Sequence, residues 1–307
     1  MSVGELPNRQ PASLGSTFGA GDLPTFYASA DQHSNRCQSR YLLLQRFQPG
    51  GLASAGIGGT TSWKLFGGQF SAAIAMVGFT LAAIARLSLS QQQPETKWFD
   101  GRAAAESTKT LAWRFAVGGE PFKVNVTEQL AVTTFTNRIL ELTQDLPSLD
   151  SPAGNHTQVT PAMRQLRGRD LHDRQTAYAT YRILDQQIWY SNKSNWNEVR
   201  SSRWAAALLT IDVLGATAAA ARLAGWIQLD LLGIAATCSA IGVAWLQAKQ
   251  HDLLSRTYAV ASHELSAIHD RLQMIHDEAE WASEVEQAEE AISREHTLWR
   301  ASRSSLR

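Results

Sequence analysis

Two stretches without charged residues decide the fold: 65–85, LFGGQFSAAIAMVGFTLAAIA, and 231–248, LLGIAATCSAIGVAWLQA. Charged residues bound both stretches, namely Lys64, Arg86, Asp230 and Lys249. At 1.5 Å per residue, each stretch is close to the ~20 residues that cross a hydrocarbon core about 30 Å thick. The sequence therefore predicts two membrane-spanning helices.

A weaker apolar run precedes each stretch, so the predicted spans are paired. Residues 204–221 are interrupted only by Asp212, and 47–63 contain a proline and several glycines. Glycine costs about 1 kcal/mol per helix position relative to alanine, so 47–63 is either a full span or a re-entrant, packed segment. The pattern predicts two helical hairpins, about 47–86 and 204–248.

Small residues in the paired runs support close helix contacts. They follow the small-xxx-small spacing that lets membrane helices approach, at Gly51, Ala55, Gly59, Gly215 and Ala219. The alternative is that the runs are buried helices of a soluble all-α protein. Their lengths and flanking charges favour the membrane reading.

Charge placement predicts the orientation of the hairpins. Lysine and arginine are frequent throughout 88–203, whereas the hairpin turns carry only Lys64 and Arg222. The positive-inside bias therefore places both termini and the middle segment in the cytoplasm. Residues 1–22 are polar and rich in Gly, Pro and Ser, and we expect a disordered tail without a cleavable signal.

Composition narrows the function classes. The 28 Lys and Arg balance 28 Asp and Glu, which disfavours a nucleic-acid partner bound through bulk positive charge. Two cysteines cannot form a disulfide framework or a four-ligand zinc site.

The two hairpins belong to units that repeat. A Pro- and Gly-containing linker, 146–161, separates 23–145 from 162–301. Tyr-xxx-Asp-Gln occurs before each hairpin, beginning at Tyr27 and at Tyr181. We therefore expect a tandem duplication of a polar helix, an apolar hairpin and a long amphipathic helix.

Long cytoplasmic helices are predicted beside the second hairpin. Apolar positions after it alternate in steps of 4 and 3, as a coiled-coil seam requires: Leu254, Tyr258, Ala261, Leu265, Ile268, Leu272, Ile275, Ala279 and Ala282. A similar stripe precedes residue 204, so the two helices can pair within one chain or between chains. The acidic stretch 277–290 is either a solvated face or a docking surface for a basic partner.

No constellation of catalytic, metal-binding or cofactor-binding residues is evident, and nothing in the sequence pairs Cys37 or Cys238 with a base. The sequence therefore predicts a protein that is not an enzyme and binds no cofactor. Asp212 is the better functional candidate, because a charge within a span usually faces a pore, a partner or water. The alternative is a misplaced span boundary. Arg222 either joins that polar site or extends to the interface.

The segment Trp98–Phe122 (WFDGRAAAESTKTLAWRFAVGGEPF) and Ile292–Ala301 (ISREHTLWRA) resemble the SLATT family of two-transmembrane effector domains. The stretch RILDQQIWYSNKSNWN, beginning at Arg182, resembles the helix that enters a second such domain. The resemblance covers about 23–122 and 162–301. It implies helix contacts by Trp98, Arg102, Glu106, Lys109, Trp113, Arg114, Asp185, Trp189, Arg294, Glu295, His296 and Trp299. Spacing alone places Trp98 to Trp113 on one helix face and predicts an i,i+4 ion pair between Arg102 and Glu106.

The resemblance also implies a function. It indicates a multi-pass inner-membrane effector of a prokaryotic, nucleotide-signalled conflict or antiphage system, with a nucleotide-generating or nucleotide-sensing protein as partner. The expected action is oligomerisation in membrane lipid to form a pore or disrupt the membrane. The alternative is a non-conducting membrane scaffold that recruits a cytoplasmic partner through its long helices.

Overall fold

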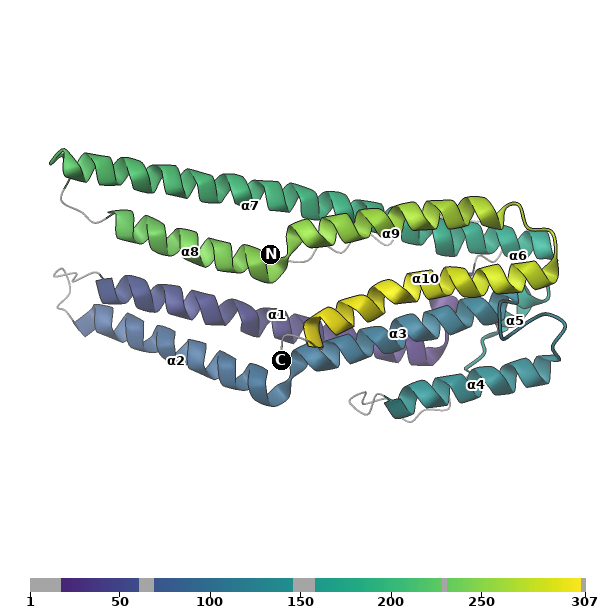
Figure 1. Cartoon of the computed structure of the whole chain (residues 1–307). Helices are drawn as coiled ribbons and strands as arrows, with labels where there is room; N and C mark the ends of the chain where they lie inside the picture. The colour runs from purple at the N-terminus through teal and green to yellow at the C-terminus, as the bar shows by residue number, and fades with distance from the viewer. Residues whose placement is uncertain (1–17, 61–68, 146–157, 228–230, 305–307) are drawn as a thin grey trace. The chain divides into compact units, whose positions relative to one another are not determined.

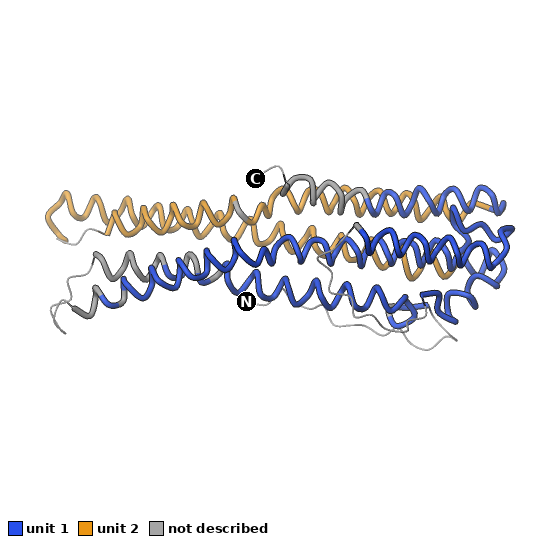
Figure 2. Tube along the Cα trace, turned by 90° about the horizontal axis from the view of Figure 1, so that it is seen from below, with its two compact units in different colours: residues 1–174, 276–307 blue, residues 175–275 orange. Residues whose placement is uncertain are grey.

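The computed structural model describes residues 18–60, 69–145, 158–227 and 231–304, and all regular structure in these ranges is helical (Figure 1). This confirms the predicted all-α class. The chain forms two compact units, and the boundary does not follow the order of the sequence (Figure 2). Unit 1 contains residues 1–174 and 276–307, whereas unit 2 contains residues 175–275.

Unit 1 is built around the long helix α3. Its elements are η1 (Ala20–Asp22), α1 (Thr25–Thr60), α2 (Gln69–Gln92), α3 (Pro94–Val117), α4 (Glu128–Asp145), α5 (Pro161–Arg167) and α10 (Glu278–Ser304). The helix α1 packs along α2 and then along α3, and α4, α5 and α10 also contact α3. The helix α6 (Leu171–Tyr178) continues the chain into unit 2.

Part of the expected tail and linker is ordered on unit 1. Phe18 is buried and meets the Trp113 ring edge-on, at 4.7 Å between centroids. Thr160 caps α5 by accepting a hydrogen bond from the Met163 N–H, and its hydroxyl donates to the Asp22 carbonyl at 2.6 Å. The expectation of disorder through residue 22 is therefore wrong for 18–22, because the Phe18 side chain is buried. Residues 1–17 and 146–157 lie outside the described residues.

The first hairpin is closely packed within the chain. The helix α1 is uninterrupted from Thr25 to Thr60, so the proline and glycines of 47–60 do not end it. A Cβ on Gly51 would lie 2.5 Å from the Gly78 carbonyl oxygen of α2, so a side chain at this position would separate the helices. Met76 and Phe79 of α2 are exposed, as a lipid-facing helix requires.

Unit 2 repeats the arrangement that α1, α2 and α3 have in unit 1. Its elements are η3 (Ala179–Leu184), α7 (Asp185–Leu223), α8 (Leu231–Lys249) and α9 (His251–Leu272). The helix α7 packs on α8 and on α9. In its apolar half, a Cβ on Gly215 would lie 2.9 Å from Ala235 Cβ of α8. The small residue at 215 therefore serves packing within the hairpin.

The same backbone feature joins the second and third helices of each repeat. Gln93 lies between α2 and α3 with φ 42°, and Gln250 lies between α8 and α9 with φ 49°. A left-handed conformation costs a residue with a Cβ about 1–2 kcal/mol. Its presence at equivalent places in both repeats supports the predicted tandem duplication.

The predicted continuous seam after the second hairpin is wrong. The helix α9 ends at Leu272 and α10 begins at Glu278. The Met274 N–H donates to the Arg271 carbonyl in a turn, and the Asp277 carboxylate accepts from the N–H groups of Ala279 and Glu280 at 2.8 and 3.0 Å. This cap starts a new helix, so the regular apolar spacing is divided between the two units.

Two helical segments among the described residues are long and apolar enough to cross a membrane, within 171–223 and 231–272. The apolar halves of these two segments form the second hairpin, which consists of α7 and α8. The large apolar side chains of this hairpin are mostly exposed. Leu209, Val213, Leu214 and Ile234 are each more than half exposed. Crossing by the first hairpin stays a prediction.

Candidate functional site

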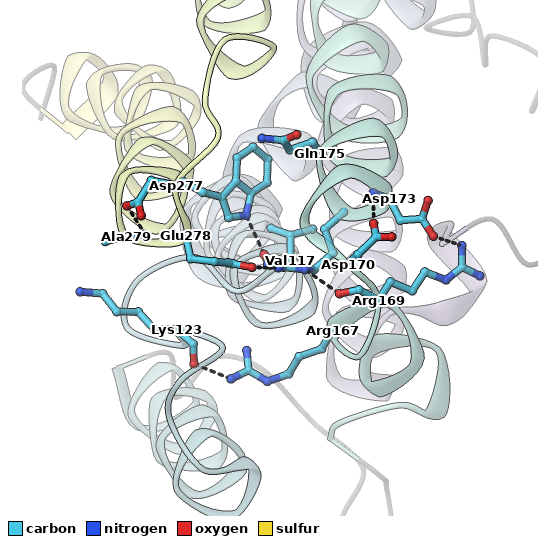
Figure 3. A network of polar contacts seen from close by, with 12 residues as sticks. Val117, Lys123, Arg167, Arg169, Asp170, Asp173, Gln175, Asp277, Glu278 and Ala279 are labelled. Carbon is cyan, nitrogen blue, oxygen red and sulfur yellow. Dashed lines mark hydrogen bonds and ion pairs between the residues drawn. The ribbon is translucent and has the colours of Figure 1, made fainter.

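A network of polar contacts outside the hairpins surrounds the last carbonyl of α3, that of Val117 (Figure 3). The Arg174 Nη1 and the Trp281 Nε1 both donate to the Val117 oxygen at 2.8 Å. Arg174 also bonds the Arg169 carbonyl at 3.1 Å and the Glu278 carboxylate. Arg174 is 1% exposed and Trp281 is fully buried. The helix end is thus satisfied by side chains from α6 and α10.

A second buried arginine holds the segment that follows α3. Arg167 donates to the carbonyls of Phe115 at 3.2 Å, Lys123 at 2.7 Å and Phe122. Its guanidinium carbon lies 5.2 Å from the centroid of the Phe115 ring. Burial and the nearby Arg174 lower the pKa of Arg167, yet arginine remains charged in proteins. The two guanidinium groups therefore fix the α3 end in place.

Contacts with α10 continue along α3. The Arg114 guanidinium pairs with Glu286 at 2.5 Å, and the Thr110 hydroxyl donates to the buried Glu289 carboxylate at 2.9 Å. A Cβ on Gly119 would collide with Val285, so glycine permits the close approach of α10. These contacts make α10 the cover of one face of α3.

The residues named from the first family motif lie along α3, and those from Trp98 to Trp113 share one face of it. Arg102 forms the i,i+4 pair with Glu106 at 2.7 Å and also lies 3.5 Å from Asp31 of α1. The Trp98 carbonyl accepts from the Ser34 hydroxyl at 3.1 Å, and its ring stacks on Phe99. Trp113 is buried beneath Phe18, and Lys109 is half-buried. Trp98 and Arg102 thus connect α3 to α1, and Trp113 connects α3 to the segment before η1, which is a role in packing.

The remaining predicted positions are separate from this site. Trp189 of α7 contacts the Tyr258 ring of α9 at 5.7 Å, whereas Asp185 is exposed. Asp212 and Arg222 are also exposed on α7, at the middle and at the end of its apolar segment. The side chains of Arg294, Glu295, His296 and Trp299 lie outside the described residues.

Sequence reasoning missed the polar contact where α9 begins. His251 Nδ1 lies 2.8 Å from the Asn197 side-chain oxygen of α7, and both residues are buried. Burial, followed by the charges of Arg200 and Lys249, lowers the pKa of His251. No metal or catalytic pattern includes these residues; only their position beside the predicted span ends was a signal.

Unit 2 is expected to lose stability below neutral pH because of His251. Its folded-state pKa is lowered, so the unfolded state binds the proton first as pH falls through about 6.5. Each unit by which the pKa is lowered corresponds to about 1.36 kcal/mol. Thermal unfolding of the full chain in detergent between pH 7.5 and 5 tests this. His251→Gln should show a smaller pH dependence, and an unchanged slope would contradict the assignment.

The described residues offer little for catalysis. No group of three His, Cys, Asp or Glu side chains among them is placed to hold a metal ion. Cys37 Sγ does lie 3.5 Å from His33 Nε2, a pairing that the sequence search overlooked. Burial raises the pKa of the Cys37 thiol, which opposes formation of a reactive thiolate. The pair is therefore no argument for an enzyme.

Comparison with protein families explains the repeat. Residues 24–175 match the family described as SMODS and SLOG-associating 2TM effector domain 3, and residues 178–299 match effector domain 1 of the same description. The chain belongs to the SLATT family. This SLATT protein carries two such domains in tandem, and the family is of the membrane-effector kind with no known catalytic activity. Searches of curated proteins and of solved structures give no match.

The family boundaries differ from those of the compact units. The second SLATT domain includes most of α10, which packs in unit 1 on the α3 of the first SLATT domain. The last helix of the second domain thus completes the helical packing of the first.

Proposed function

We propose that this SLATT protein is a membrane effector of a nucleotide-signalled conflict system and that its spans oligomerise to open a polar path containing Asp212. The observation that carries the proposal is the environment of this carboxylate. Asp212 lies near the middle of the apolar part of α7 and is exposed, and within the described part of the chain it has no hydrogen-bond or ion-pair partner.

A charge in this place needs a partner or water. An aspartate at the centre of a membrane helix costs at least about 2.5–3.5 kcal/mol when it faces lipid. The position favours a contact outside the single chain, because the neighbouring face of α8 is already occupied by packing at Gly215 and Leu208. A water-filled path lined by several copies would remove the cost.

The helix face that contains Asp212 suits such an assembly. Its members recur in steps of 4 and 3: Ala205, Leu209, Asp212, Ala216 and Ala219. Three of the five are alanines, which allow close approach of another helix in a membrane. Asp212 is therefore central in a face that is small enough to pack between chains.

The scaffold alternative has less support. The apolar stripe of α9 was its predicted partner surface, and Leu265, Ile268 and Leu272 are buried within unit 2. Because α7 packs along α9 within one chain, this seam is not an open surface for a cytoplasmic partner. A nucleotide-generating or nucleotide-sensing partner belongs to the proposal through the family description. The cytoplasmic termini belong to it through the excess of lysine and arginine outside the hairpin turns, and the inner-membrane location is part of the proposal.

Replacing Asp212 with leucine tests the proposal. In cells that express the full chain at high level, wild type should collapse the membrane potential, measured with a voltage-sensitive dye. Asp212→Leu should reduce the rate of collapse at least about tenfold, because a lumen without the carboxylate is less favourable for ions. Crosslinking in the membranes checks that both proteins form oligomers.

Thr210→Val is the matched control on the same span. Thr210 is exposed about 160° around the helix from Asp212, and its hydroxyl only bonds the Ala206 carbonyl of its own helix. This variant should behave as wild type. Oligomers of wild type that leave the potential unchanged, or an Asp212→Leu variant with full activity, would refute the pore.

A further inference from the structure

We infer that unit 2 carries a binding surface for anionic phospholipid headgroups where α7 enters and α8 leaves the membrane. The surface, here called the cationic belt, consists of Lys193, Trp196, Arg200 and Arg203 of α7 with Trp245 and Lys249 of α8. It requires only that α7 and α8 span the membrane, and it does not depend on the pore.

The belt is continuous along one face of α7. Lys193, Trp196, Arg200 and Arg203 follow each other in steps of 3, 4 and 3, which keeps them within about 80° of one another around the helix. Arg203 immediately precedes the apolar segment that begins at residue 204. Lys249 immediately follows the apolar segment of α8. Arg203 and Lys249 therefore lie at the same boundary of the membrane, with Arg200 about one turn and Lys193 about three turns farther along α7.

The cations rest on aromatic rings. The Arg200 guanidinium carbon lies 4.0 Å from the centroid of Trp196, and Lys193 Nζ lies 5.8 Å from the same ring. Lys249 Nζ lies 4.6 Å from the Trp245 centroid. Contact with a ring face uses no N–H donor, so the guanidinium N–H groups of Arg200 can still donate hydrogen bonds to a phosphate. Tryptophan and basic side chains are the residues that membrane interfaces favour.

The acidic side chains nearest to Arg200 and Lys249 in the sequence, Glu198 and Asp252, are directed away from Arg200 or paired elsewhere. Glu198 lies two positions before Arg200 and therefore about 160° away around α7. Asp252 of α9 pairs with Arg256 at 3.2 Å. The Trp196 ring on which Arg200 lies also meets the His251 ring edge-on, at 5.7 Å between centroids, so Arg200 lies beside the residue that begins α9 two positions after Lys249. The net charge of this boundary is positive.

This combination fits a lipid better than a soluble anion. A headgroup phosphate would meet the Arg200 and Lys249 charges while its glycerol and first acyl carbons contact the flanks of Trp196 and Trp245. A free phosphate gains nothing from the rings. The structure therefore points to an anionic phospholipid as the occupant.

Lipid titration of the full chain in neutral detergent tests the inference. Phosphatidylglycerol and phosphatidylcholine with identical acyl chains are added separately, and bound lipids are counted by native mass spectrometry. Wild type should prefer phosphatidylglycerol. Each basic residue at a membrane surface contributes about fivefold in affinity, so Arg200→Gln with Lys249→Gln should weaken phosphatidylglycerol binding roughly 25-fold. Binding of phosphatidylcholine should not change.

Two further variants separate charge from folding. Arg200→Lys with Lys249→Arg keeps both charges and should keep the preference. Arg138→Gln with Arg164→Gln removes two exposed, ion-paired arginines elsewhere and should also keep it. Equal binding of the two lipids by wild type would overturn the inference, as would displacement of phosphatidylglycerol by millimolar inorganic phosphate. Loss of the preference in the charge-retaining variant would assign the effect to packing and overturn it as well.

Discussion

Replacing Arg174 with methionine is expected to lower the free energy of unfolding of unit 1 by about 3–5 kcal/mol. Methionine fills part of the volume but donates no hydrogen bond. The change removes the contacts to the Val117 and Arg169 carbonyls and to Glu278, from a side chain that is 1% exposed. Hydrogen bonds from a charged group are worth about 1.5–3 kcal/mol each, and a buried carbonyl left without its donor adds to the loss.

Denaturant unfolding of the full chain in detergent measures this effect. Hydrogen exchange assigns it to a unit, since amides of 98–122 should exchange faster while those of 185–203 keep their rates. Arg138→Met is the matched control. Arg138 is exposed and pairs with Glu141 three residues on, so its replacement should change the stability by less than about 0.5 kcal/mol. Similar losses in the two variants would show that burial of Arg174 has no energetic role.

The hairpins were predictable because they rest on a property of single segments. A charge-free run such as 231–248 identifies a span without knowledge of its neighbours. The repeat was likewise predictable from the order of polar and apolar segments. The equivalent left-handed residues Gln93 and Gln250 were not, because glutamine carries no signal for that conformation.

The polar site was not predictable because its parts are distant in the chain. Arg174 was one of many basic residues used to orient the loops, and nothing local distinguishes it from the exposed Arg138. Its burial depends on Val117 and Trp281, which are far from it in sequence. Asp212 illustrates the converse, because an apolar run makes one charge conspicuous, and its side chain is exposed on α7 in the described part of the chain.

The break between α9 and α10 was not predictable from the sequence for a different reason. The apolar spacing continues through 273–277, and neither glycine nor proline marks the turn. Spacing reports which residues are buried but not against which helix, so one regular pattern supplied a face for α9 in unit 2 and another for α10 in unit 1. The acidic stretch 277–290 accordingly includes Glu286 and Glu289, which bond α3.

Replacing Trp281 with alanine is expected to destabilise unit 1 by about 3–5 kcal/mol, the usual cost of removing a buried aromatic side chain. Trp281 is fully buried, and its indole donates to the Val117 carbonyl at 2.8 Å. Trp281→Phe retains most of the apolar contact and should lose only about 1 kcal/mol, from the hydrogen bond. Trp226→Ala is the control, because Trp226 is 81% exposed and its removal should have little effect.

The part of the chain that Trp281→Ala destabilises is as informative as the size of the loss in stability. The family match assigns α10 to the second SLATT domain, whereas its packing belongs to α3 of the first. In Trp281→Ala, hydrogen exchange should therefore rise in 98–122 and in α10, and 185–203 with 251–272 should stay protected. Faster exchange confined to 185–203 and 251–272 would contradict the placement of α10. If the first pattern holds, a tandem SLATT chain cannot be divided at residue 175 without removing the cover of its first domain.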